Sequence, residues 1–241
     1  KRMEIKVWRT SCENPFQTGS KVVKSKKMLY TYAIRIWKRI RTQEVTMGRY
    51  LNPGMESFEK SVNSEIYVDK TGLVGYTNRV MNTVQGYVCV SRPRRFGKSM
   101  AANMLTAYYS RGCDSREIFS KFEISESPDF EKYRNKYNTI FLNMQEFLSR
   151  SDSVEALVDR VKKLVLRDLK REYPDVDYFD DTDLVESMQD IYETEKCPFV
   201  VIIDEWDCIF REFRQNKEAQ EKYLDFLRDL LKDKACIHLA Y

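Results

Sequence analysis

The sequence predicts an α/β domain, a three-layer sandwich in which helices cover both faces of a mainly parallel sheet. Short apolar segments with the length of strands alternate along the chain with longer segments of helical periodicity. The strand-like segments are continuously apolar, as in the run from Phe199 to Ile203, which is typical of strands buried on both faces. With 42% apolar and 32% charged residues, the composition is that of a folded protein.

Basic residues are concentrated at the beginning of the chain. Residues 1–46 contain 12 Lys and Arg against 3 Glu, a net charge of +9, whereas the remainder has 29 Lys and Arg against 34 acidic residues, a net charge of −5. We therefore expect a basic N-terminal extension over 1–46, disordered or not native, and one domain over 47–241, because Met47 opens a sequence that looks like a natural start. A helix over 28–41 that binds a membrane surface or a partner is the alternative.

The elements of the domain follow in order from a turn at Asn52-Pro53-Gly54. We expect helices up to about residue 62, over 70–83, over 97–109, from a cap at Asp152 to about 173, from a cap at Asp181, and over 218–232. We expect strands over 66–68, 87–90, 138–143, 199–203 and 235–241. Because the sequence stops inside an apolar strand, we expect the domain to be incomplete at its C-terminus.

A basic loop joins the expected strand at 87–90 to the following helix; it reads Ser91-Arg92-Pro93-Arg94-Arg95-Phe96-Gly97-Lys98-Ser99. This context is that of a phosphate-binding P-loop, or Walker A motif, in which backbone N–H groups and a helix N-terminus hold phosphates. Gly97 would then allow close approach, Lys98 would reach the β- and γ-phosphates, and Ser99 would ligate Mg²⁺. The expected nucleotide-binding residues are Arg94, Arg95, Phe96, Gly97, Lys98, Ser99 and Met100. The usual pattern has glycine where this chain has Arg92, so the loop alone leaves open a basic turn that caps a helix.

A second motif follows the strand at 199–203, which runs directly into Asp204-Glu205. An acid at the end of a buried strand is a Walker B arrangement, in which Asp204 holds Mg²⁺ through a water and Glu205 polarises the attacking water. Glu205 and Lys98 are therefore the expected catalytic residues. One further strand, 138–143, separates the motifs, which marks the additional-strand, catalytic-glutamate class of P-loop NTPases. In that class the strand at 235–241 lies between the two motif strands and carries a sensor residue at its end.

Three segments together resemble a known family: Tyr67-Val68-Asp69-Lys70-Thr71, then SRPRRFGKSM, then IIDEWD. In order and spacing they closely resemble the bacterial AAA-ATPase-like family, over about residues 47–241, and an arginine in place of the first P-loop glycine is a trait of that family. The resemblance implies binding and hydrolysis of ATP with Mg²⁺. Members often carry a C-terminal PD-(D/E)XK nuclease-like domain, which is absent from these residues, so we expect no nuclease activity here.

Two functions stay open from the sequence. The first is a Mg-dependent ATPase that drives or gates an attached effector, and the alternative is a non-hydrolysing, nucleotide-dependent switch or protein-interaction module. Direct binding of DNA by residues 1–46 ranks below both because the rest of the chain is acidic, so contact with DNA would be indirect, through an effector. A homo-oligomer also stays open. No segment has the length of apolar sequence that a membrane helix needs, and we expect a cytoplasmic protein.

Several charged residues near the motifs have two interpretations. The loop arginines Arg92, Arg94 and Arg95 would neutralise phosphate charge or act as a local arginine finger, or else bind an acidic neighbour. Asp69 and Lys70 would form a structural cap and a salt bridge, with a position near the nucleotide base as the alternative.

Two polar residues follow strand ends. Asp207 is expected to cap a helix, with assistance to Mg²⁺ or a partner contact as the alternative. Asn143 is a further candidate for orienting the attacking water.

Overall fold

The computed structural model describes residues 48–91, 93 and 95–241. The expected extension over 1–46, the alternative helix over 28–41 and two of the loop arginines, Arg92 and Arg94, lie outside the described residues. The described residues belong to one compact unit. Its centre is a parallel three-stranded sheet of β1 (Asn138–Asn143), β2 (Phe199–Asp204) and β3 (Ile237–Ala240), in the order β1-β2-β3. The predicted α/β class is therefore confirmed.

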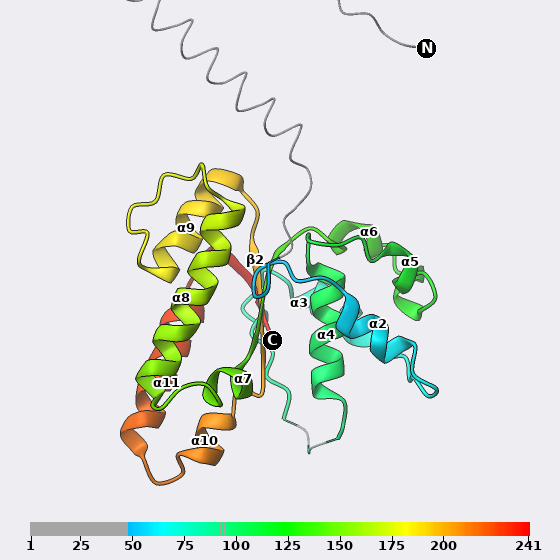
Figure 1. The fold of residues 1–241 in the computed structure, drawn as a ribbon. Helices are drawn as coiled ribbons and strands as arrows, with labels where there is room; N and C mark the ends of the chain where they lie inside the picture. Colours follow the sequence, from blue (N-terminus) through cyan, green and yellow to red (C-terminus); the bar gives the residue numbers. More distant parts are fainter. Residues whose placement is uncertain (1–47, 92, 94) are drawn as a thin grey trace, which may run out of the picture. The chain divides into compact units, whose positions relative to one another are not determined.

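Helices lie in two groups on either side of this sheet (Figure 1). One group contains α2 (Glu56–Val62), α3 (Gly72–Val80), α4 (Lys98–Tyr109), α5 (Arg116–Phe119), the short 3₁₀ turn η1 (Glu123–Glu126) and α6 (Phe130–Tyr133). The other contains α7 (Met144–Leu148), α8 (Val154–Glu172), α9 (Leu184–Glu195), α10 (Cys208–Glu212) and α11 (Lys217–Leu231). Within the ranges that the structure describes, no helix is both long enough and apolar enough to cross a membrane.

Alternate side chains of β2 pack against the two groups of helices. Phe199 and Val201 belong to a core with β1, α8, α9 and α11, whereas Val200 and Ile202 belong to a second core with α3 and α4. All four side chains are fully buried. Because successive side chains of a strand point to opposite faces, a strand covered on both faces must be apolar at every position. This requirement explains the continuous apolar run in the sequence.

The register of the strands brings the ends of β1 and β2 to the same level. Asn143, the last residue of β1, pairs with Asp204, the last residue of β2. On the far side of β3, Tyr87 forms a parallel bridge with Ala240. The segment that leads into the basic loop therefore lies beside β3, and β3 lies between it and β2, as predicted for the strand at 235–241. Polar residues from three chain segments consequently meet at one edge of the sheet.

Helix α4 is fixed against α3 by a buried network of polar side chains. Tyr109 donates its hydroxyl proton to Asn78 Oδ1 at 2.8 Å, and Asn78 Nδ2 donates to the Tyr108 hydroxyl at 3.2 Å. The Tyr108 hydroxyl in turn donates to the Phe130 carbonyl at 2.8 Å. Both tyrosines are fully buried, so each hydroxyl needs such a partner. The network holds the helix whose N-terminus begins at Lys98.

Two expected strands are not formed. Residues 66–68 are a loop in which Ile66 and Val68 are 81% and 64% exposed. These apolar side chains are not covered by a neighbouring strand or helix of the described residues, so the short apolar run does not specify a buried strand here. Residues 87–90 make only the bridge at Tyr87, and Tyr87 and Cys89 are exposed. The expectation of burial on both faces is wrong here because this segment lies at an edge, with one described neighbour.

Helices α8 and α9 are capped one and two residues later in the chain than expected. Helix α8 is capped by Ser153, whose side chain accepts the Ala156 N–H at 3.1 Å, and not by Asp152. Helix α9 is capped by Asp183, whose Oδ1 accepts the N–H groups of two following residues. Asp181 instead forms an ion pair with a lysine of α8. In both cases the cap is the residue that directly precedes the first helical position, where its oxygen reaches the free N–H groups.

The single histidine of the chain, His238, predicts a pH dependence of stability. Burial lowers its pKa below the ordinary value of about 6.5. The unfolded chain then binds the proton more readily, so stability is lost as the pH falls through about 6.5 towards the lower folded pKa. We expect thermal unfolding of the wild type to shift down between about pH 7 and pH 5.5 more steeply than that of His238→Gln. Parallel melting-temperature profiles of the two proteins would contradict this assignment.

Candidate functional site

The loop before α4 has a left-handed backbone at two positions. Gly97 has a φ of 77° and Arg95 a φ of 70°. A β-carbon makes such an angle costly, so glycine is favoured at the point where the loop enters the helix. An ideal β-carbon on Gly97 would also lie 2.5 Å from the Lys70 Nζ. The loop therefore turns sharply, with its backbone closely packed, directly before Lys98.

The first turn of α4 presents backbone donors to this loop. The first helical hydrogen bond that involves Gly97 runs from the Ala101 N–H to the Gly97 carbonyl at 3.0 Å. The N–H groups of Lys98, Ser99 and Met100 come earlier in the chain. They have no acceptor within the helix, because the carbonyl four residues before each of them lies outside the helix. Unpaired N–H groups and the helix dipole together make a helix N-terminus favourable for an anion.

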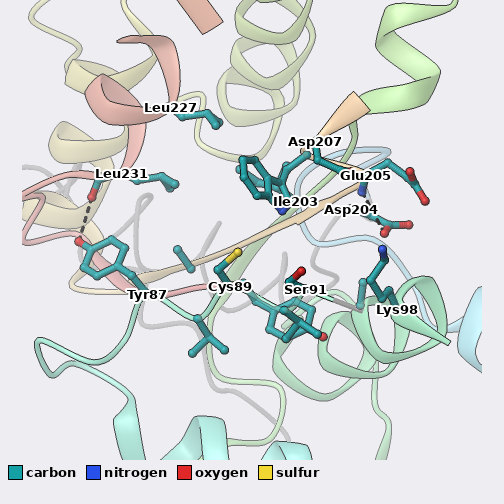
Figure 2. A pocket seen from close by; sticks show the side chains of 16 residues that line it. Tyr87, Cys89, Ser91, Lys98, Ile203, Asp204, Glu205, Asp207, Leu227 and Leu231 are labelled. Atoms are coloured by element: carbon teal, nitrogen blue, oxygen red, sulfur yellow. Dashed lines mark hydrogen bonds between the residues drawn. The ribbon is translucent and has the colours of Figure 1, made fainter. Parts of the chain in front are cut away.

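The two acids of the second motif lie at the end of β2, opposite this helix. Asp204 is 6% exposed, and its Oδ1 accepts the Glu205 N–H at 3.0 Å. Glu205 has a φ of 53°, which turns the chain sharply after the strand. Figure 2 shows the side chain of Lys98 directed at the carboxylates of Asp204 and Glu205. The structure thus brings the two predicted motifs together.

Arg211 of α10 bonds the second of these acids. Its guanidinium forms ion pairs of 2.6 Å with both Glu205 Oε2 and Asp207 Oδ1, and it donates to Gln145 Oε1 at 3.4 Å. The hydrogen bond with Glu205 raises the pKa of Arg211 above its ordinary value, so the guanidinium stays charged. The Glu205 carboxylate is therefore held by a cation in this structure.

Two adjoining pockets meet at Lys98 and Glu205. The larger, of about 680 Å³, is polar and contains most of the predicted site; it is lined by Pro93, Arg95, Gly97, Lys98, Ser99, Met100, Asn143, Gln145, Glu146, Ser149, Glu205 and Arg211. The smaller, of about 360 Å³, also reaches Asp204 and Trp206 and continues to an apolar end between Tyr87 and Leu231 (Figure 2). The polar pocket is the one whose walls carry the loop, the helix N-terminus and Glu205.

A comparison with protein families agrees with this arrangement. A family model described as predicted AAA-ATPase matches residues 52–236, which include the loop, both acids and Arg211. The chain belongs to the AAA-ATPase-like family. Searches of curated proteins and of solved structures found no match. Membership of the AAA-ATPase-like family is consistent with an ATP-binding domain.

The residues of this AAA-ATPase-like chain fit a nucleotide phosphate group. The polar pocket combines a helix N-terminus, a glycine in a left-handed conformation and a lysine, which are the donors and the space that a phosphate chain requires. In the described part of the chain no three His, Cys, Asp or Glu residues are grouped to hold a metal ion. That finding is compatible with Mg²⁺, which commonly uses one or two protein ligands and completes its shell with water and phosphate oxygens.

The remaining predicted residues have different positions. Phe96 is 60% exposed and lines neither pocket, and Arg94 lies outside the described residues. Asn143 lines the polar pocket, but its Oδ1 accepts the Glu146 N–H at 3.2 Å as the cap of α7. Asp207 precedes α10 without a capping hydrogen bond from its side chain, which bonds Arg211 instead.

Four polar residues that line the polar pocket were missed by sequence analysis: Gln145, Glu146, Ser149 and Arg211. Arg211 follows Asp207 by four residues, the spacing of an ion pair on one helix face, so this signal was present. Gln145 follows the end of β1 and enters the pocket from α7. No pattern in the sequence distinguishes Gln145 from other polar residues, because its position depends on how α7 packs against α10.

Proposed function

We infer that residues 47–241 form a P-loop domain of the additional-strand, catalytic-glutamate class that binds Mg-ATP and hydrolyses it. The observation that carries this proposal is the meeting of Lys98 and Ser99, at the start of α4, with Glu205 in one polar pocket. A basic turn that only capped a helix would not require an acid from a distant strand in the same pocket. The domain would drive or gate an attached effector, which is nuclease-like in the family that the sequence resembles.

The geometry suggests a role for each residue of the pocket. The N–H groups of the first turn of α4 would bind phosphate oxygens, and the Lys98 ammonium would neutralise the charge of the β- and γ-phosphates. The Ser99 hydroxyl and the Asp204 carboxylate would hold Mg²⁺. Bound ATP supplies the phosphoryl group that is transferred. Glu205 would orient a water molecule and accept its proton.

The ion pair between Arg211 and Glu205 favours a second candidate function. The Oε2 of Glu205 bonds the Arg211 guanidinium at 2.6 Å, so this oxygen is engaged and not free to orient a water molecule. If this contact persists when nucleotide is bound, the domain is a switch that binds ATP and presents the bound state to a partner without hydrolysis. Release of phosphate from ATP by the protein separates the two candidates.

Binding of nucleotide is tested by thermal unfolding with and without Mg-ATP. Ligand at about one hundred times its Kd stabilises a protein by about 2.7 kcal/mol, which corresponds to a rise of about 5–10 °C for a domain of this size. We expect this rise in the wild type and its loss in Lys98→Ala, because the variant lacks the cation that faces the phosphates.

The matched control is Lys163→Ala, which removes an exposed lysine of α8 and should keep the full rise. An equal rise in the wild type and in Lys98→Ala would contradict the assignment of the loop. No rise in a wild type that unfolds cooperatively would contradict nucleotide binding itself.

A further inference from the structure

The segment Asp69-Lys70-Thr71 is anchored on both sides of Lys70. Asp69 accepts the Thr71 N–H at 2.7 Å with one carboxylate oxygen and the Glu123 N–H at 3.1 Å with the other. Burial alone would raise the pKa of Asp69, but the hydrogen bonds from Thr71 and Glu123 outweigh it and lower the pKa below its ordinary value. Thr71 is fully buried, and its hydroxyl oxygen accepts the Ile124 N–H at 3.3 Å. The backbone at Lys70 is thus fixed against the turn η1.

From this anchored position Lys70 reaches the basic loop. Its Nζ donates to the Phe96 carbonyl at 3.1 Å, across 26 positions of sequence. The same Nζ lies 2.5 Å from the point where a β-carbon on Gly97 would be. The ammonium therefore packs directly on the peptide unit between Phe96 and Gly97. Lys70 does not line the polar pocket, whereas Gly97 does, so Lys70 approaches the loop from outside that pocket.

This contact orients one backbone donor of the loop. In a trans peptide the carbonyl oxygen and the following N–H point in opposite directions, and the described residues contain no cis peptide bond. When Lys70 holds the Phe96 carbonyl, the Gly97 N–H must point away from Lys70. A charged donor on the carbonyl also polarises the peptide and strengthens the N–H as a donor.

We propose that Lys70 is a positioning residue of the phosphate site: it binds the Phe96 carbonyl, holds the loop in its left-handed turn and directs the Gly97 N–H towards phosphate. The proposal rests on the proposed nucleotide-binding function. It differs from the salt bridge and the position near the base that the sequence suggested, because the acceptor in the structure is a loop carbonyl. The loop has Arg92 where the usual pattern has glycine, and the contact with Lys70 restrains the peptide unit between Phe96 and Gly97.

The test measures the Kd of Mg-ATP, Mg-ADP and AMP for the wild type, Lys70→Met and Lys70→Arg by calorimetry. We expect Lys70→Met to raise the Kd of ATP and ADP by a similar factor, about tenfold, as for loss of a hydrogen bond to a charged group. The Kd of AMP should rise much less, because the Gly97 N–H would bind the β- and γ-phosphates, which AMP lacks. Lys70→Arg should recover part of the affinity. The control is Lys121→Met, an exposed lysine before η1 that removes the same charge.

A loop-positioning role also predicts a change without ligand. The chain has eight glycines, and their amide resonances can be observed selectively by NMR in protein labelled with nitrogen-15 glycine. The Gly97 amide resonance should shift in Lys70→Met and not in Lys121→Met. Unchanged affinities, a loss confined to ATP, or an equal loss for AMP would each overturn the proposal. If the wild type binds none of the nucleotides, the proposed function fails; if the wild type binds and Lys70→Met binds equally, only the role of Lys70 fails.

Discussion

Glu205→Gln is expected to lower the rate of ATP hydrolysis by roughly 10²–10⁴-fold while nucleotide binding is kept. The amide has the size of the carboxylate but cannot accept the proton of the attacking water. Binding should persist because the loop and Lys98 are untouched, so the thermal shift with Mg-ATP should equal that of the wild type. The measurement is phosphate release at saturating ATP, together with the melting temperature with and without ligand.

The loss of one negative charge in Glu205→Gln needs its own control. Glu212→Gln makes the same chemical change at an exposed position of α10 and should leave turnover as in the wild type. Glu205 and Arg211 are each about a quarter exposed, and Arg211 keeps its contact with Asp207, so the cost in stability should stay below about 1 kcal/mol. Equal turnover in Glu205→Gln and the wild type would remove the catalytic assignment. If the wild type binds ATP but does not hydrolyse it, the result would favour the second candidate function, a nucleotide-dependent switch.

Phe199→Ala is expected to destabilise the fold severely. Phe199 begins β2, the middle strand of the sheet, and its side chain is 0% exposed. Loss of a buried phenyl ring leaves a cavity and costs about 3–5 kcal/mol. At about 2–4 °C per kcal/mol, the melting temperature should fall by about 6–20 °C, measured by thermal unfolding without ligand.

Phe179→Ala is the matched control, because Phe179 is 90% exposed and only its backbone N–H forms a hydrogen bond with Asp190. Its melting temperature should stay close to that of the wild type, within about 0.5 kcal/mol of stability. Similar losses in the two variants would show that β2 is not the centre of the core.

The parts of the fold that sequence predicted well are those governed by local burial. Helix α4 and strands β1 and β2 were placed to within one residue, because an apolar pattern specifies both the element and the face it buries. The segment at 87–90 was predicted as a doubly buried strand from the same kind of apolar run. Its exposure depends on which strand lies beside it, and a sequence window does not contain that information.

The candidate site shows the same division. Lys98, Ser99, Asp204 and Glu205 were found because each lies at a fixed offset from a strand or a helix start. The contact of Lys70 with the Phe96 carbonyl was not found, since it joins segments that only tertiary packing brings together. The ion pairs of Arg211 are local, and the spacing to Asp207 was a signal that was not used. The roles assigned to the first group stay predictions, because the family match supports nucleotide binding only in general terms.

The all-parallel pairing of β1, β2 and β3 has a consequence for how the molecule assembles. Each pairing joins strands that are connected through intervening helices, so the chain must close long loops before the sheet forms, and such folds form slowly. The polar pocket draws residues from the loop, the end of β1 and the end of β2, so it exists only after the last of these pairings. A ligand of this pocket would therefore not accelerate folding, and it would act by slowing the unfolding of the completed molecule.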